Sequence, residues 1–123
     1  MTSIDGSTLT DTDRNASLTV TDTGRILVPA LESLSRTSLK ATSNGALDLS
    51  AVTLLQVQNN EAAIVATTNG TIDLSSVEVI NGPVGAANPS AQYDLVINAQ
   101  SGGQIDLSAA TQVLNQVPIT ADG

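Results

Sequence analysis

The stretch IVATTNGTIDLS at residues 64–75 decides the fold, because two close copies of it occur elsewhere in the chain. The copies are LKATSNGALDLS at 39–50 and INAQSGGQIDLS at 97–108. Each copy places apolar residues at alternate positions before and after a glycine. A chain that repeats itself in this way stacks similar units on one another instead of folding around a single globular core. We therefore predict a repeat architecture.

Aligning the chain on this glycine extends the repeat toward both ends. The anchor glycines are Gly24, Gly45, Gly70, Gly103 and Gly123, at intervals of 21, 25, 33 and 20 residues. Val117 and Ile119 precede the last glycine by six and four residues, as the apolar residues of the other copies precede theirs. We expect each glycine to occupy a sharp corner that requires φ > 0, a conformation that Asn44 and Asn69 also tolerate.

After each glycine the apolar residues continue with period two, which is typical of a strand with one buried face. In the second copy Ile72 and Leu74 would point inward and Asp73 outward, and a third apolar stretch follows at Val77 and Ile80. Three strands of about five residues with their corners need roughly 20 residues. The sequence thus predicts an all-β parallel β-helix, a β-solenoid with three short strands per coil and about four to five coils. The preference of parallel crossovers makes it right-handed.

The domain organisation follows from the same alignment. Residues 1–16 fit the repeat poorly and are predicted to form an N-terminal cap or linker, whereas residues 17–123 form the coils and end in the middle of one. The longest interval contains a predicted loop insertion at about 81–93, where Asn-Gly-Pro and Asn-Pro are strong loop signals. A smaller insertion near 58–61 lies in the corresponding place.

Composition narrows the class of protein. The chain has 123 residues, of which 41% are hydrophobic, enough for one folded domain, but Tyr93 is its only aromatic residue. The core must therefore be narrow and built from Leu, Ile, Val and Ala. The net charge of −8 argues against nucleic acid and anionic membrane surfaces as partners. No apolar run is long enough for membrane insertion, and the first residues do not resemble a signal peptide.

The Gly-x-Ile-Asp-Leu-Ser phrase, together with the alternation, resembles the β-helical repeat regions of large secreted bacterial adhesins, the filamentous-haemagglutinin-like class. The resemblance covers about residues 17–123. It implies a structural or adhesive module, without catalytic activity, in a larger extracellular or cell-surface protein. Its partners would be glycans or host and cell-surface proteins. Because inserted loops carry function on a uniform scaffold, we expect the 81–93 excursion to be the binding surface.

One column of acidic residues offers an alternative function. Asp48, Asp73 and Asp106 would project from one face about 4.8 Å apart, so a glycan-binding or glycan-cleaving β-helix is the first alternative. We interpret them instead as solvated residues that keep the strand face polar. The chain contains no His for general base catalysis and no Cys nucleophile, so we predict no enzyme and no cofactor. A Ca²⁺ site needs six or more oxygens, more than this column and its serines supply, so we predict no metal site.

Three further features complete the prediction. Tyr93 is a possible ligand-facing residue, although a lone Tyr in a loop is more often an anchor packed on the scaffold. The open ends of the stack could associate with other copies of the chain, which is the second alternative function. We do not expect an ice-binding face, because only one column is rich in threonine: Thr21, Thr42, Thr67, Gln100 and Thr120.

Overall fold

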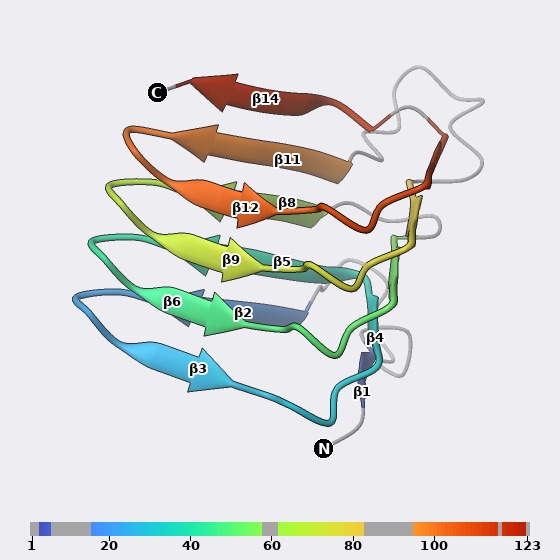
Figure 1. Cartoon of the computed structure of the whole chain (residues 1–123), viewed down its shortest axis with the longest axis horizontal. Helices are drawn as coiled ribbons and strands as arrows, with labels where there is room; N and C mark the ends of the chain where they lie inside the picture. The colour runs from blue at the N-terminus through green and yellow to red at the C-terminus, as the bar shows by residue number, and fades with distance from the viewer. Residues whose placement is uncertain (1–2, 6–15, 58–61, 83–94, 116, 123) are drawn as a thin grey trace.

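The computed structural model describes residues 3–5, 16–57, 62–82, 95–115 and 117–122, and every regular element in these ranges is a β-strand. The strands form three parallel sheets, here named A, B and C (Figure 1). Sheet A contains, in spatial order, β1 (Ser3–Asp5), β4 (Ser33–Ser35), β7 (Leu54–Gln56), β10 (Val79–Asn81) and β13 (Gln112–Leu114). Sheet B contains β2 (Ala16–Val20), β5 (Thr37–Ala41), β8 (Ala62–Ala66), β11 (Leu95–Gln100) and β14 (Ile119–Asp122). Sheet C contains β3 (Arg25–Leu27), β6 (Ala46–Asp48), β9 (Thr71–Asp73) and β12 (Gln104–Asp106).

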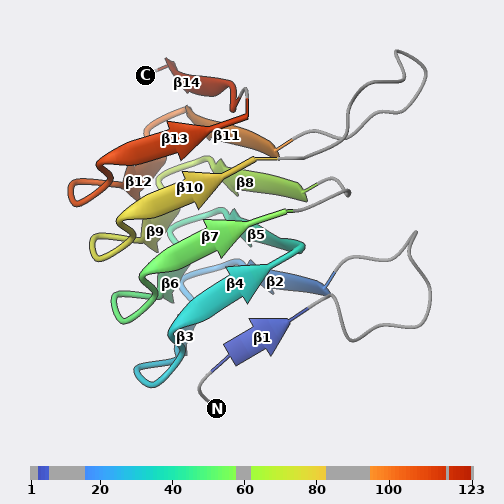
Figure 2. The same cartoon turned by 90° about the vertical axis from the view of Figure 1, so that its right-hand side faces the viewer.

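The chain visits the sheets in the order B, C, A and then rises to the next coil. Four coils have all three strands, from β2–β4 to β11–β13, while β1 and β14 belong to the neighbouring layers. In Figure 1 the chain runs leftward along the rear strand β2, turns, runs rightward along the front strand β3 and rises through β4, which is a right-handed path. Figure 2 shows sheet A from the outside, with each strand above its counterpart in the previous coil. The predicted parallel β-helix is confirmed.

The core is a narrow apolar column that runs through the coils. The period-two pattern holds in the middle of the stack, where Ile64 is fully buried in β8 while its neighbours Ala63 and Val65 are only half-buried. Apolar residues pair with apolar residues of the next coil, as in the register Leu47 with Ile72. The largest fully buried side chains are all aliphatic: Leu31, Leu34, Leu39, Leu47, Leu49, Leu55, Ile64, Ile72, Leu74, Ile80, Leu95 and Ile97.

The corner between sheets B and C has a conformation that differs from the prediction. In the third coil Thr68 and Asn69 are left-handed, with φ of 51° and 62°, and the Gly70 N–H donates to the Thr67 carbonyl at 2.9 Å. This is the geometry of a type I′ turn. Gly70 itself is not left-handed, so the predicted reason for the glycine is wrong, whereas the prediction for Asn69 is confirmed.

The glycine is required by the close approach of two coils. A Cβ atom at Gly70 would overlap the carbonyl oxygen of Ala41 in the coil below, and one at Gly103 would overlap that of Ala66. At Gly45 it would lie 2.9 Å from the carbonyl oxygen of Val20. Among the described glycines only Gly102, which precedes the anchor of the last coil, has a left-handed φ, of 79°.

The C-terminal register also differs from the prediction. In β14, Ile119 pairs with Ile97 and Ala121 with Ala99, so Val117 lies two residues before the position assigned to it. Thr120 therefore belongs to the column of Asn98 instead of the threonine column. Gly123, the predicted fifth anchor, lies outside the described residues. A two-residue slip leaves the same face inward, so alternation alone could not distinguish the two registers.

The N-terminal segment supplies one strand to the stack. β1 pairs in parallel with β4, with Ile4 at the register position of Leu34. The cap or linker predicted for residues 1–16 thus includes a strand of sheet A.

Coils differ in length mainly at the corner that joins sheet A to sheet B. Only Arg36 separates β4 from β5, whereas residues 82–94 separate β10 from β11. The insertion predicted at 81–93 lies outside the described residues except for Asn81, the last residue of β10, and Gly82. Tyr93 also lies outside them. No helix in the described segments is long and apolar enough to cross a membrane.

Candidate functional site

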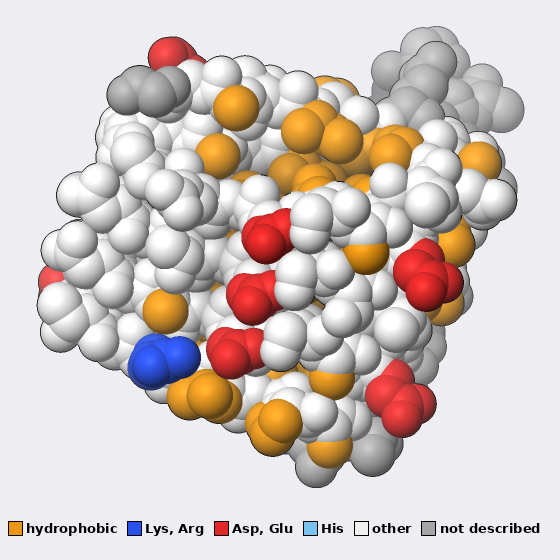
Figure 3. Space-filling view, viewed as in Figure 1, with side chains coloured by type: hydrophobic (Ala, Val, Ile, Leu, Met, Phe, Trp, Pro, Cys, Tyr) orange, Lys and Arg blue, Asp and Glu red, His pale blue; other side chains and the backbone are white. Residues whose placement is uncertain are grey.

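The predicted aspartate column is present on sheet C. Asp48 pairs with Asp73 and Asp73 with Asp106, each as the last residue of its strand. Figure 3 shows acidic side chains in a column on this face of the molecule. In the first coil Leu27 occupies the same column, three residues after Gly24, and its side chain is 55% exposed.

Each of these carboxylates holds the turn that follows its strand. The backbone N–H of the serine two residues later donates to Oδ1 of the aspartate, at 3.2 Å for Asp48, 3.0 Å for Asp73 and 2.9 Å for Asp106. The Ser50 hydroxyl adds a second hydrogen bond to Asp48 Oδ1, at 2.7 Å. An aspartate that accepts from the backbone two residues on forms an Asx-turn, which orients the chain for a corner. The Asp-Leu-Ser sequence therefore has a local structural role in three successive coils.

These hydrogen bonds lower the pKa of two of the carboxylates, Asp48 and Asp106. The Ser50 hydroxyl, the Ser50 backbone N–H and the charge of Arg25 hold the pKa of Asp48 below its usual value. The Ser108 hydroxyl and backbone N–H lower the pKa of Asp106 in the same way. A glycosidase needs one carboxyl group whose pKa is raised so that it can act as the acid. The pKa of Asp48 and of Asp106 is shifted in the opposite direction, downward.

The described residues contain no group of three or more Asp, Glu, His or Cys side chains arranged to hold a metal ion. The three aspartates share a column, but their Oδ1 atoms are directed to their own turns. Tyr93, the other candidate ligand-facing residue, lies outside the described residues, so the structure brings together only the aspartates.

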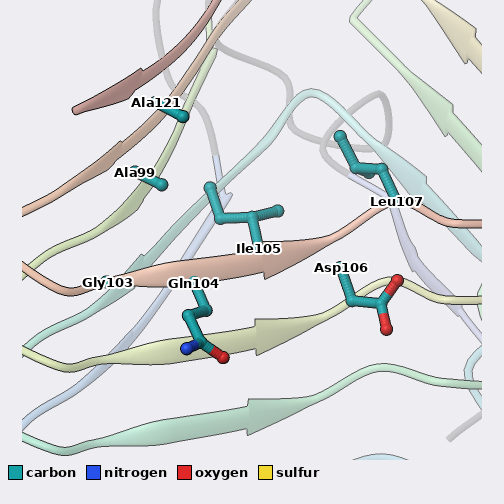
Figure 4. Close-up of a pocket in the computed structure, with 7 residues that line it drawn as sticks. All are labelled: Ala99, Gly103, Gln104, Ile105, Asp106, Leu107 and Ala121. Carbon is teal, nitrogen blue, oxygen red and sulfur yellow. The ribbon is translucent and has the colours of Figure 1, made fainter. Parts of the chain in front are cut away.

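A hollow that the sequence did not reveal lies at the C-terminal end of the stack. Its volume is about 460 Å³, and Ala99, Gly103, Ile105, Leu107 and Ala121 contribute to its lining together with Gln104 and Asp106. Figure 4 shows Ile105 on the side of Ala99 and Ala121, with Gln104 and Asp106 directed away from them. Apolar side chains gather around this end in Figure 3. The last described strand of sheet C is β12, whereas sheet B continues to β14, so the hollow lies over β12 in the layer of β14.

No family model, curated protein or solved structure matches this chain.

Proposed function

We propose that this chain is a structural, non-catalytic β-solenoid module that extends and displays a binding surface in a larger extracellular or cell-surface protein. The proposal rests on the structural roles of the residues that recur in the repeated sequence. Its apolar residues fill the core, its glycine lets coils approach, and its aspartate holds a turn. Every recurring position therefore contributes to building the stack.

The stack is suited to act as a stiff spacer. Backbone hydrogen bonds join each coil to the next in all three sheets, for example Thr71 N–H to the Gly45 carbonyl at 2.9 Å and Leu74 N–H to the Asp106 carbonyl at 3.0 Å. These bonds run along the axis of the solenoid, and a continuous aliphatic core accompanies them. Bending the axis would have to stretch one sheet and break its ladder.

The adhesive part of the proposal is assigned to the corner between sheets A and B. The number of residues that join sheet A to sheet B differs from coil to coil, and binding residues are commonly located on inserted loops. We propose that the segment between β10 and β11 contacts glycans or cell-surface proteins, in preference to the aspartate column.

The test compares two variants on an immobilised glycan array and on intact cells, with and without Ca²⁺. In the first variant a short Gly-Ser link replaces residues 83–92; we expect binding to be lost while the thermal unfolding midpoint changes little. In the second, Asp73→Asn, we expect binding to be retained, because the amide oxygen can still accept from Ser75. Binding that persists without residues 83–92, or that disappears in Asp73→Asn at unchanged stability, would refute this assignment and favour a glycan site on sheet C.

A further inference from the structure

We infer that Asn69, in the turn between β8 and β9, is the acceptor of an N-linked glycan. The inference rests on the extracellular or cell-surface location in the proposed function, because N-glycosylation is typical of secreted proteins. It does not depend on which segment binds a partner, since this turn lies at a different corner from the one assigned to binding.

The sequence Asn69-Gly70-Thr71 matches the acceptor pattern Asn-x-Ser/Thr, in which x is any residue except proline. Asparagine accepts the sugar, and the hydroxyl two residues later belongs to the pattern that the transferase recognises. The pattern occurs once more, at Asn15-Ala16-Ser17, where Asn15 lies outside the described residues. Proline in the middle position excludes Asn88-Pro89-Ser90. The described part of the chain therefore contains one complete acceptor sequence.

The structure presents both functional side chains of this sequence to solvent. Asn69 and Thr71 are exposed, whereas Gly70 between them is buried. Within the described part of the chain neither the Asn69 amide nor the Thr71 hydroxyl makes a hydrogen bond. Asn81 differs, because its Oδ1 accepts from Asn115 Nδ2 at 2.8 Å. The amide nitrogen of Asn69 can therefore carry a substituent without the loss of a side-chain hydrogen bond.

The backbone of the turn is also compatible with a substituent on this amide. The Asn69 N–H donates to the Ser101 carbonyl of the coil above at 3.2 Å, and the Thr71 N–H donates to the Gly45 carbonyl of the coil below at 2.9 Å. Both bonds hold neighbouring coils together, and neither involves the side-chain nitrogen. Modification of Asn69 leaves them in place.

The coil above provides space at Asn69 that the equivalent turn of the second coil lacks. Asn44 has the same left-handed conformation, with φ of 65° against 62° for Asn69, but the residue stacked above it is Asn69 with its own side chain. The residue stacked above Asn69 is Gly102, and a Cβ atom there would overlap Asn69 Oδ1. The side chain that Gly102 lacks is thus what allows the Asn69 amide its position.

The transfer reaction needs a glycosyl donor with a diphosphate leaving group, attached either to a lipid or to a nucleoside. Nδ2 of Asn69 attacks the anomeric carbon of the donor. A C–N bond forms as the C–O bond to the diphosphate breaks, the diphosphate leaves with the bonding electrons, and the nitrogen loses one proton to a base of the transferase. No oxidant or reductant takes part.

The position of the turn makes a glycan compatible with binding elsewhere on the solenoid. In Figure 1 the turn between β8 and β9 projects at the left, whereas sheet A lies at the right. N-linked glycans are bulky and solubilising. A glycan on Asn69 would therefore shield the corner between sheets B and C from lateral contacts and leave the corner between sheets A and B open.

The test is secretion of the chain from a host that N-glycosylates, followed by peptide mass spectrometry. Enzymatic removal of an N-glycan in heavy-oxygen water converts the modified asparagine to labelled aspartate. We expect label at Asn69, its loss in Thr71→Ala and its retention in Thr71→Ser. Unlabelled aspartate at this position is the product of spontaneous deamidation, and finding it without any label would overturn the inference. Circular dichroism melts verify that both variants are folded.

The matched control uses the turn of the second coil. Ala46→Thr, combined with Thr71→Ala, supplies the missing hydroxyl two residues after Asn44 and removes the one after Asn69. Each chain is compared with the same chain from a host that does not glycosylate. We expect a glycan on Asn44 to lower the thermal unfolding midpoint, because a side chain is stacked above it, and a glycan on Asn69 to leave the midpoint unchanged. A lowered midpoint for the chain glycosylated at Asn69 would overturn the inference.

The outcomes separate this inference from the proposed function. A secreted, folded chain without label at Asn69 would overturn the inference, and binding of that chain to glycans or cells would leave the proposed function standing. Labelled Asn69 in a chain that binds neither would have the opposite meaning. The binding assays use chain from both kinds of host, and we expect equal binding, because the glycan lies away from the corner between sheets A and B.

Discussion

The middle coils and the last coil contain the same sequence phrase, yet they bury it to different extents. Ile72 and Ile80 of the third coil are 1% and 0% exposed, whereas Ile105 of the fourth is only partly buried and Val113 is 48% exposed. What distinguishes them is the coil stacked above, since sheets A and C have no described strand beyond β13 and β12. In this fold a side chain is buried by the neighbouring coils, so identical residues can have different energetic roles.

The largest predicted contrast is between core truncations in the two regions. Leu55→Ala in β7 removes a side chain that is 1% exposed and should lower the free energy of unfolding by about 2–5 kcal/mol. Val113→Ala occupies the same column two coils later and should cost less than about 1 kcal/mol. Urea unfolding measures both. Equal losses would contradict the dependence of burial on the coil above.

The next contrast concerns the anchor glycines. Gly70→Ala places a Cβ against the backbone carbonyl of Ala41 and should cost about 3 kcal/mol, because backbone atoms cannot move aside without separating the coils. In the first coil, a Cβ at Gly24 would lie 2.9 Å from Thr21 O and 3.1 Å from a methyl group of Val20, so Gly24→Ala should cost clearly less. Thermal unfolding of the two variants measures the difference. A larger loss at Gly24 would show that the glycine serves its own turn and not the contact between coils.

The glycines illustrate how far the sequence alone can be interpreted. The spacing of the anchors and the period-two alternation predicted three strands per coil, and the inward positions Ile72 and Leu74 were identified correctly. The reason for the glycine was not predicted correctly. It lies in a contact between coils, and the two residues in contact, such as Ala41 and Gly70, are 29 positions apart in the sequence. Local preferences contain no information about such a contact.

The same limit applies to register and to the candidate site. Alternation identifies the face of β14 but not its register, which depends on the pairing of Ile119 with Ile97. The aspartate column was predicted in the correct place, since its members follow the same glycine by three residues. Its hydrogen bonds to Ser50, Ser75 and Ser108 depend on the turn geometry and could not be derived from spacing.

A smaller effect is predicted for the turn between sheets B and C. Thr68 is β-branched and has φ of 51°, a conformation that costs roughly 1–2 kcal/mol for most residues and less for Asn. Thr68→Asn should therefore raise the free energy of unfolding by up to about 1 kcal/mol. The control Thr71→Asn alters an exposed strand position and should lower the free energy of unfolding slightly. A gain in Thr71→Asn instead of Thr68→Asn would contradict this account.

In the last coil Gly102→Ala should be destabilising, because φ of Gly102 is 79° and a Cβ would overlap Asn69 Oδ1.

The aspartates predict a dependence of stability on pH. Hydrogen bonds from Ser50 and Ser108 lower the pKa of Asp48 and Asp106 in the folded chain below the usual value of an aspartate, so the unfolded chain binds protons more readily. This contribution to stability is fully present above the unfolded-state pKa and is lost as the pH falls through the folded-state pKa. Urea unfolding at pH 6 and pH 3 should show a smaller decrease in Asp106→Asn than in the unmodified chain. If Asp106→Asn loses as much stability between pH 6 and pH 3 as the unmodified chain does, other carboxylates account for the loss.

The smallest effect separates the two ends of the aspartate column. The Ser50 hydroxyl, the Ser50 backbone N–H and the charge of Arg25 all lower the pKa of Asp48, whereas the pKa of Asp106 is lowered by Ser108 alone. Arg25→Gln should therefore move the pKa of Asp48 slightly upward, and carboxyl carbon NMR titration should find the pKa of Asp106 unchanged. Raising the salt concentration should move the Asp48 pKa in the same direction in the unmodified chain and less in Arg25→Gln, because screening weakens the charge interaction but leaves the hydrogen bonds intact. If the two aspartates respond alike to Arg25→Gln, the column titrates as one coupled unit, and the difference between its ends does not come from Arg25.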